Sequence, residues 1–185
     1  MKRPLLIVFL GFPGSGKTYF AKKLADKLPA VTFNSDALRL AMFGSLENIE
    51  VIRQKDQSRL YTDVFGAMDY AAKQALRAGV SVIYDAQQTK RENRRGIEAL
   101  ARETGALPVL VWIKTSKQTA LERGMTRAED SDSVRYERQK MTMLIHRFNA
   151  VTDLPDSHEN VIEISGEITF EEQYEQFMKR LGELS

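Results

Sequence analysis

The chain of 185 residues contains no cysteine and only two histidines, His146 and His158. The missing cysteines exclude disulfide bonds, thiolate zinc sites and cysteine nucleophiles, and two separated histidines give no metal-ligand cluster. The longest apolar run, Leu5 to Leu10, has six residues, which is too short for a membrane span or for the core of a signal peptide. We therefore expect a cytoplasmic protein without membrane attachment, whose only metal arrives with its ligand.

The chain also lacks an excess of charge of either sign. It has 27 basic and 25 acidic side chains, which gives a formal net charge of +2. No strong overall field draws such a protein to nucleic acid, so a nucleic-acid partner would need a local basic patch. The hydrophobic fraction of 43% and the length of 185 residues are typical of one globular domain, which we predict to span 1–185.

Strand and helix patterns alternate along the whole chain. This alternation predicts an α/β fold, a five-stranded parallel sheet with helices on both faces. The predicted strands cover 5–10, 30–33, 80–84, 109–113 and 161–164, and the predicted helices include 54–78, 89–104 and a terminal helix from 170. Ligands of such sheets bind beyond the carboxyl ends of the strands.

The most specific motif is the glycine-rich segment Gly11–Thr18, which follows the first strand directly. Its glycines allow successive backbone N–H groups to converge on phosphates at the start of a helix, Lys17 supplies a point charge, and the Thr18 hydroxyl suits Mg²⁺. The motif predicts binding of ATP with Mg²⁺ and, together with the alternating strands and helices, a P-loop NTPase fold, a three-layer sandwich of the nucleoside-kinase type. The predicted nucleotide-contacting residues are Gly11, Pro13, Gly14, Ser15, Gly16, Lys17, Thr18 and Tyr19.

Acidic residues follow the second and third predicted strands. Asp85 comes directly after an apolar strand, and we interpret it as the Walker B acid that completes the Mg²⁺ site with Thr18. Asp36 and Arg39 stand one helical turn apart after the second strand, where a carboxylate can orient an acceptor hydroxyl and an arginine can hold an anionic acceptor. The alternatives are that Asp85 caps the next helix, for which Thr89 is better placed, and that Asp36 caps a helix with Arg39 as its surface partner.

The chain resembles the small P-loop kinases around the phage-type polynucleotide 5′-hydroxyl kinases, with zeta-toxin and chloramphenicol phosphotransferase kinases as relatives. The resemblance covers nearly the whole chain, and the motifs that carry it are 11–18, 34–39, 82–85 and 122–127. It implies that Asp36 is the general base on the acceptor hydroxyl and that Arg39 engages the acceptor's phosphate. It also implies that Arg127 belongs to a lid over the triphosphate.

We expect a helical lid around 115–148, with Arg127 as its catalytic arginine and Arg123 in reserve for the same role. A planar guanidinium stabilises the charge that spreads over a transferred phosphoryl group. The alternative is that these arginines are solvated or paired with the neighbouring acids Glu129, Asp130 and Asp132.

These assignments predict an ATP-dependent phosphotransferase with an alcohol group as acceptor, most closely a nucleic-acid 5′-hydroxyl kinase. The first alternative is a kinase of a small metabolite, antibiotic or nucleotide-sugar hydroxyl. The second is a noncatalytic ATP-dependent switch, which would not need the pair formed by Asp36 and Arg39. Two basic groups could track a nucleic-acid backbone, namely Lys90, Arg91, Arg94 and Arg95, and Arg53, Lys55 and Arg59. We place the adenine contacts near Ser165 and Gly166; the sequence leaves the oligomeric state open.

Overall fold

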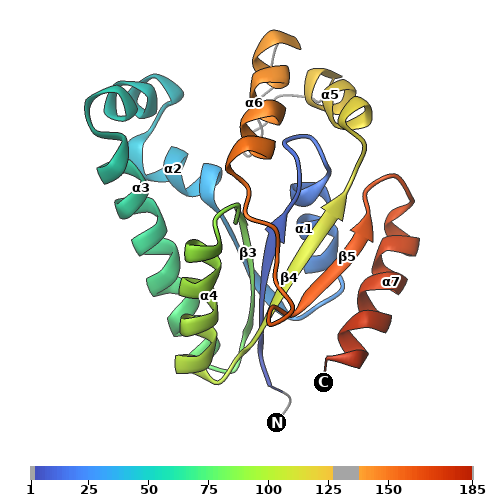
Figure 1. Ribbon diagram of the computed structural model, residues 1–185. Helices are drawn as coiled ribbons and strands as arrows, with labels where there is room; N and C mark the ends of the chain where they lie inside the picture. Colours follow the sequence, from blue (N-terminus) through green and yellow to red (C-terminus); the bar gives the residue numbers. More distant parts are fainter. Residues whose placement is uncertain (1–2, 127–137, 185) are drawn as a thin grey trace.

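Five parallel strands form the centre of the computed structural model, which describes residues 3–126 and 138–184. The strands are hydrogen-bonded in the order β2-β3-β1-β4-β5, so the first strand of the chain lies in the middle of the sheet (Figure 1). Their bounds are β1 Leu5–Leu10, β2 Ala30–Asn34, β3 Ser81–Gln87, β4 Leu107–Lys114 and β5 Val161–Ser165. The predicted α/β class with a five-stranded parallel sheet is therefore confirmed.

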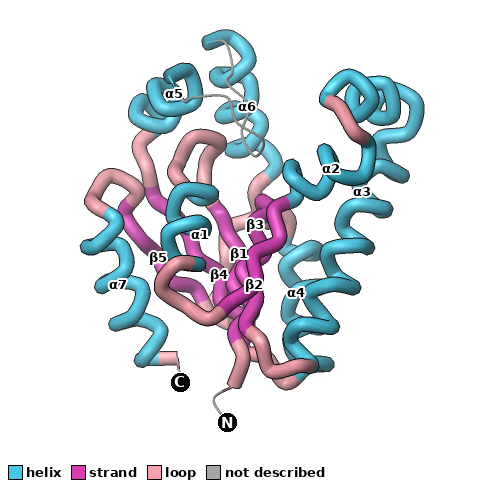
Figure 2. Tube along the Cα trace, turned by 180° about the vertical axis from the view of Figure 1, so that it is seen from behind, coloured by secondary structure: helices cyan, strands magenta, loops and turns pink. Residues whose placement is uncertain are grey.

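Helices cover both faces of the sheet. The described helices are α1 Lys17–Ala25, α2 Ser35–Phe43, α3 Leu46–Arg77, α4 Arg91–Thr104, α5 Lys117–Thr126, α6 Arg138–Val151 and α7 Phe170–Glu183. Figures 1 and 2, which view the molecule from opposite sides, show α3 and α4 against one face and α1 and α7 against the other. None of the helices in the described part of the chain has the length and apolar character that a bilayer crossing requires.

Alternate residues of β1 enter two separate hydrophobic cores. Leu6, Val8 and Leu10 are buried against the apolar face of α3 and against α4, whereas Ile7 and Phe9 are buried with residues of α1 and α7. Successive side chains of a strand point to opposite faces, so a strand with helices on both sides must be apolar at every position. The unbroken run from Leu5 to Leu10 thus fits the central place of β1.

The long helix α3 begins earlier in the sequence than predicted. The sequence pattern predicts a start at 54, but α3 begins at Leu46, where the Ser45 hydroxyl caps the helix by accepting from the Asn48 N–H at 3.1 Å. At Asp56 the backbone leaves helical geometry, with φ −156° and ψ 83°. The Asp56 carboxylate accepts from the Arg59 N–H at 2.9 Å, so it acts as an N-cap for the second part. The predicted start near this kink reflects that second beginning.

Three helices stand at the carboxyl ends of the strands. Figure 1 shows α5 and α6 beyond the arrowheads of the sheet and α2 beside them. The helices α5 and α6 meet where Gly124 faces Met141, whose side-chain atoms lie as near as 2.5 Å to the position that a Cβ on this glycine would take. This edge is the one at which parallel α/β sheets bind their ligands.

Candidate active site

The glycine-rich loop connects β1 to α1 in a conformation that needs glycine. Gly14 and Gly16 have φ angles of 80° and 100°, and a Cβ on Gly14 would lie 2.2 Å from the Ala120 carbonyl oxygen. Gly16 is the N-cap of α1 and offers no side-chain cap, so the first N–H groups of the helix have no side-chain acceptor at their cap. Lys17 Nζ lies over the loop and donates to the Gly11 and Phe12 carbonyls at 2.9 and 2.8 Å. The loop therefore combines convergent N–H groups with a cation, as phosphate binding requires.

Asp85 joins this loop to the second strand. Its carboxylate accepts from Asn34 Nδ2 at 2.6 Å and, over a long 3.5 Å, from Thr18 Oγ1, because β2 and β3 pair in a register that sets Asn34 beside Asp85. Burial raises the pKa of the Asp85 carboxyl above its usual range, although the hydrogen bonds from Asn34 and Thr18 and the nearby charge of Lys17 oppose this rise.

The alternative role of Asp85 as a helix cap does not fit the structure. Asp85 lies within β3, which continues to Gln87, and not at the strand end where the sequence pattern placed it. The N-cap of α4 is Lys90, which makes no side-chain cap, so Thr89 is not a cap either. The Thr18 hydroxyl and the Asp85 carboxylate place two hard oxygen atoms side by side, the type of donor that Mg²⁺ prefers beside phosphate oxygens. Among the described residues no group of three or more acidic or histidine side chains forms a metal site by itself.

Asp36 and Arg39 lie together at the start of α2. Asn34, not Asp36, is the N-cap of this helix and accepts from the Asp36 and Ala37 N–H groups at 3.0 and 2.8 Å. Arg39 Nη1 is 2.5 Å from Asp36 Oδ1, so the ion pair expected under the capping alternative is present while the cap is not. The Asp36 side chain is 65% exposed and that of Arg39 only 12%, which leaves the carboxylate accessible to a ligand.

Arg39 is held from behind by aromatic rings of α3. Its guanidinium carbon is 5.5 Å from the centre of the Tyr61 ring and 5.9 Å from that of Phe65, and the two rings are stacked with an angle of 5° between them. Contacts of a guanidinium with ring faces are attractive and restrict its orientation. Arg39 is therefore a fixed cation at the cleft and not a mobile surface side chain.

A cleft of about 1500 Å³ runs along the carboxyl edge and contains these groups. Among the predicted site residues, those that line it are Pro13, Gly14, Gly16, Lys17, Thr18, Tyr19, Asp36, Arg39, Asp85 and Arg123. Gly11 and Ser15 are not part of its wall, and Ser15 is fully buried beneath the loop. The cleft thus brings the predicted nucleotide, metal and acceptor residues to one space.

Two further cleft residues were not singled out as a pair by the sequence pattern. The hydroxyl of Tyr84, a buried residue of β3, donates to Asp69 Oδ1 of α3 at 2.7 Å. Burial raises the pKa of Asp69, and the hydrogen bond from Tyr84 partly offsets this effect. Asp69 follows Tyr61 and Phe65 at intervals of four, so helical spacing could have shown that it shares their face.

The other side of the cleft is built from α5 and the loop after β5. Arg123 Nη1 donates to the Gly166 carbonyl at 2.6 Å, and a Cβ on Gly166 would lie 2.7 Å from the Ser15 carbonyl oxygen. The segment at Ser165 and Gly166, where we expected adenine contacts, therefore packs directly on the phosphate-binding loop. Arg127, the predicted lid arginine, lies outside the described residues.

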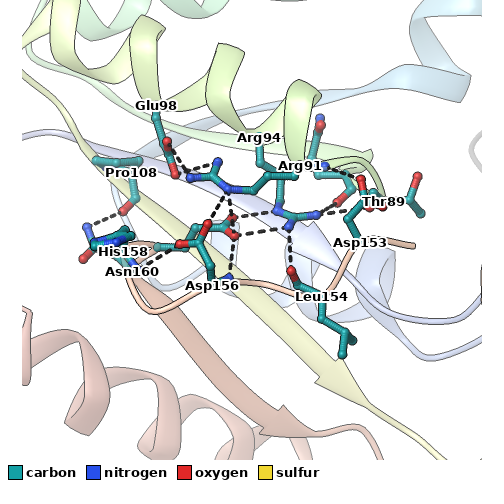
Figure 3. A network of polar contacts seen from close by, with 12 residues as sticks. Thr89, Arg91, Arg94, Glu98, Pro108, Asp153, Leu154, Asp156, His158 and Asn160 are labelled. Carbon is teal, nitrogen blue, oxygen red and sulfur yellow. Dashed lines mark hydrogen bonds and ion pairs between the residues drawn. The ribbon is translucent and has the colours of Figure 1, made fainter. Parts of the chain in front are cut away.

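Two of the four basic residues in the expected group Lys90, Arg91, Arg94 and Arg95 are not free surface cations. Figure 3 shows Arg91 and Arg94 of α4 turned toward the segment that contains Asp153 and Asp156. Arg91 Nε is 2.9 Å from Asp156 Oδ2, and Arg94 is only 2% exposed and pairs with Glu159, itself 3% exposed, at 2.6 Å. These two arginines are engaged in ion pairs, which leaves only Lys90 and Arg95 of this group exposed to track a nucleic-acid backbone.

The second basic group is also paired in part. Arg53 lies 2.5 Å from Glu50, and Arg59 lies 3.6 Å from Asp63. These are exposed pairs between neighbouring turns of one helix, which contribute little to stability and reduce the local positive charge.

Comparison with known proteins gives one family and several relatives. Residues 6–149 match the family described as an AAA domain. A 6-phosphofructo-2-kinase/fructose-2,6-bisphosphatase of Aquarana catesbeiana is 31% identical over 111 residues, which cover 55% of this chain and 24% of that protein. The chain thus spans about a quarter of the length of this curated relative.

Solved structures with the same fold include two kinases. An unliganded sugar kinase from Janibacter sp. HTCC2649 has a TM-score of 0.66 and 19% identity, with 97% of this chain and 95% of that chain covered. A gluconokinase from Sinorhizobium meliloti 1021 has a TM-score of 0.67 and 18% identity, with coverages of 99% and 95%. At such identities the likeness establishes a shared fold.

Proposed function

This chain belongs to the AAA domain family, and from its cleft we propose that it is an ATP-dependent kinase that phosphorylates an alcohol group of a small hydroxylated molecule. The observation that carries the proposal is the joint presence in one cleft of Lys17, Asp85 and the pair Asp36 and Arg39. A nucleotide switch needs the first two but has no use for a carboxylate and a fixed cation opposite the phosphates. This argues for phosphoryl transfer rather than for ATP-dependent switching.

In the proposed mechanism the glycine-rich loop and the start of α1 hold the triphosphate. Lys17, which donates to loop carbonyls in the structure, exchanges these for phosphate oxygens of ATP and neutralises charge that develops on the transferred group. Thr18 and Asp85 would hold Mg²⁺, which supplies positive charge to the phosphate oxygens when it is bound. Asn34 orients the Asp85 carboxylate through its 2.6 Å hydrogen bond.

The acceptor half of the mechanism uses Asp36 and Arg39. Asp36 accepts the proton of the acceptor hydroxyl while the hydroxyl oxygen attacks the γ-phosphorus. The bond from the γ-phosphorus to the β,γ-bridging oxygen breaks, and ADP is the leaving group. Arg39, held by the rings of Tyr61 and Phe65, binds an anionic group of the acceptor. Asp69, oriented by Tyr84, is available to a second acceptor hydroxyl.

A small acceptor is supported better than a nucleic acid. The proteins that match this chain include a 6-phosphofructo-2-kinase/fructose-2,6-bisphosphatase, a sugar kinase and a gluconokinase, and Arg91 and Arg94 are engaged in ion pairs. Arg39 gives the cleft a fixed cation suited to a carboxylate or phosphate. Because an oligonucleotide also offers phosphates, it is the matching kinases and the paired arginines that favour a hydroxylated acid or a sugar phosphate, which corrects our preference from the sequence.

Parts of the prediction from sequence remain proposals. We retain a single domain over 1–185, a lid formed by the helical segment 115–148 and a cytoplasmic location. The lid is supported by Arg123 of α5 and by Leu144 and Arg147 of α6, which line the cleft. Arg127 keeps its proposed catalytic role in that lid.

A transfer assay with ATP labelled at the γ-phosphate tests the proposal. The anionic small acceptors are gluconate and fructose 6-phosphate, each compared with the corresponding polyol or sugar that lacks the carboxylate or phosphate. The nucleic-acid acceptors are a 5′-hydroxyl oligonucleotide and a nucleoside 3′-monophosphate. We expect labelling of an anionic polyol and little of the oligonucleotide, and Arg39→Ala should remove the preference for the anionic acceptor. Exclusive labelling of the oligonucleotide and the nucleoside 3′-monophosphate would contradict the small-molecule proposal. Labelling of no acceptor, with the same rate of ATP hydrolysis in the wild type and in Asp36→Asn, would contradict kinase activity altogether.

A further inference from the structure

A glutamine on α7 forms part of the cleft wall on the side away from Arg39. Gln173 is 4% exposed and lines the cleft together with Gly166, Ile168 and Phe170. Its Nε2 donates to the Ser165 carbonyl at 2.9 Å. A carbonyl oxygen can only accept, so this contact decides which end of the amide is the nitrogen and which is the oxygen.

The other end of this amide has no partner. Gln173 Oε1 is shielded from water and accepts no hydrogen bond from the described residues. Leaving a buried acceptor unpaired costs about 1–3 kcal/mol, and buried polar atoms in native proteins almost always have a partner. An orphan acceptor in the wall of a binding cleft indicates a ligand that donates a hydrogen bond there.

The position of Gln173 relative to the phosphate-binding loop limits what that ligand is. Its partner Ser165 is followed by Gly166, which packs on the Ser15 carbonyl and accepts from Arg123 at 2.6 Å. This half of the cleft therefore adjoins the phosphate-binding loop on the β4 and β5 side. Asp36 and Arg39 lie after β2, on the opposite side of central β1.

The two halves differ in chemistry. The half after β2 holds Asp36, Arg39 and Asp69, whereas Ile168 and Phe170 flank Gln173 in the other half. A charged acceptor suits the first half, and a planar, largely apolar base suits the second. We propose that Gln173 reads the purine base of the nucleotide, with Oε1 accepting a hydrogen bond from the exocyclic amino group of adenine. The inference rests on the proposed use of ATP and, because Oε1 is shielded, it requires a small shift of the wall when the base enters.

This contact predicts a definite order of nucleotides. Adenine carries an amino donor at position 6, whereas guanine carries an oxygen acceptor there. Hypoxanthine has the same oxygen as guanine, and unsubstituted purine has neither group. An amide oxygen fixed by its neighbour attracts the amino group and repels an oxygen, so the affinity should fall from ATP to purine riboside triphosphate and further to ITP.

The test is to measure dissociation constants of these three nucleotides by titration calorimetry, without any acceptor. We expect the wild type to bind ATP about tenfold more tightly than ITP, with purine riboside triphosphate between them, as one good hydrogen bond and one avoided repulsion imply. Gln173→Leu should bring the three constants to within about threefold of one another. Gln176→Leu, on the exposed side of the same helix, is the matched control and should keep the wild-type order.

The ratio of two nucleotides within one variant does not depend on how much of that variant is folded. A structural role of Gln173 would weaken all three nucleotides equally and leave the ratios unchanged, which would overturn the inference. Equal binding of ATP and ITP by the wild type would overturn it without any variant. The binding test uses no acceptor and is therefore independent of the transfer assay. If the protein binds ITP more weakly than ATP but transfers phosphate to no acceptor, the role of Gln173 is upheld and only the kinase proposal is refuted.

Discussion

Replacement of Arg94 by methionine should destabilise the protein by about 3 kcal/mol, at the lower end of the range for breaking a buried ion pair from one side. Arg94 donates to both oxygens of Glu159, at 2.6 and 3.1 Å, and to the carbonyls of Gln88, Thr89 and Leu154 at 3.2, 3.1 and 3.4 Å. The substitution leaves a carboxylate that is 3% exposed without its main counterion.

Two contacts moderate the loss and set the estimate at the lower end. Arg91 Nε remains 3.4 Å from Glu159 Oε2, and the Asp156 N–H donates to the same oxygen at 3.0 Å. For a protein of this size about 3 kcal/mol corresponds to a melting temperature lower by roughly 6–12 °C.

Urea unfolding followed by circular dichroism measures this loss. The control is Arg180→Met, because Arg180 forms an exposed pair with Glu183 at 3.0 Å that should contribute about 0–1 kcal/mol. The double variant Arg94→Met with Glu159→Met should recover most of the stability, since it removes the stranded charge as well. A loss below about 1 kcal/mol in the single variant, or a double variant less stable than the single one, would refute the reasoning.

Three further outcomes test the site. Lys17→Ala should abolish transfer to every acceptor and weaken ATP binding, as measured by labelled transfer and calorimetry, and wild-type turnover would contradict the assignment. Asp36→Asn should lower the transfer rate by ~10² or more while ATP affinity stays the same, whereas an unchanged rate would refute a general base. Asp85→Asn should raise the melting temperature of the protein free of metal and nucleotide at neutral pH. Burial raises the pKa of Asp85, so at a pH above the ordinary carboxyl pKa the charged Asp85 destabilises the folded state. This gain should shrink as the pH falls and wild-type Asp85 takes up a proton; a gain that grows toward acid pH has the wrong sign.

The parts that sequence predicts well are those built from neighbouring residues. The phosphate-binding loop lies between an apolar run and a helix, all within 5–25, and the alternation of strands and helices was enough for the parallel sheet. The predicted bounds of β3 and α3, 80–84 and 54–78, differ from those in the structure, Ser81–Gln87 and Leu46–Arg77. A kink at Asp56 and a strand that continues past Asp85 both depend on how the elements pack, which no local pattern records.

The parts that sequence misses are contacts between distant residues. Asp85 accepts a hydrogen bond from Asn34, which is 51 residues away in the sequence. This contact depends on the register of β2 against β3. From the sequence we interpreted Arg94 as a surface cation, because its partner Glu159 lies 65 residues further along the chain. A single sequence shows which side chains are charged, but it does not show which of them face each other.

The place of β1 in the sheet also bears on how the protein comes to be folded. Of the five strands β1 is synthesised first, yet its two neighbours are β3, which ends at Gln87, and β4, which ends at Lys114. The six apolar residues of β1 therefore lack one neighbouring strand until residue 87 has been synthesised and the other until residue 114. Pairings between residues so distant in sequence are slow and leave strand edges open to aggregation. Docking of β3 and β4 onto β1 should therefore limit the folding rate, and the phosphate-binding loop, which hangs from the end of β1, becomes ordered only after that step.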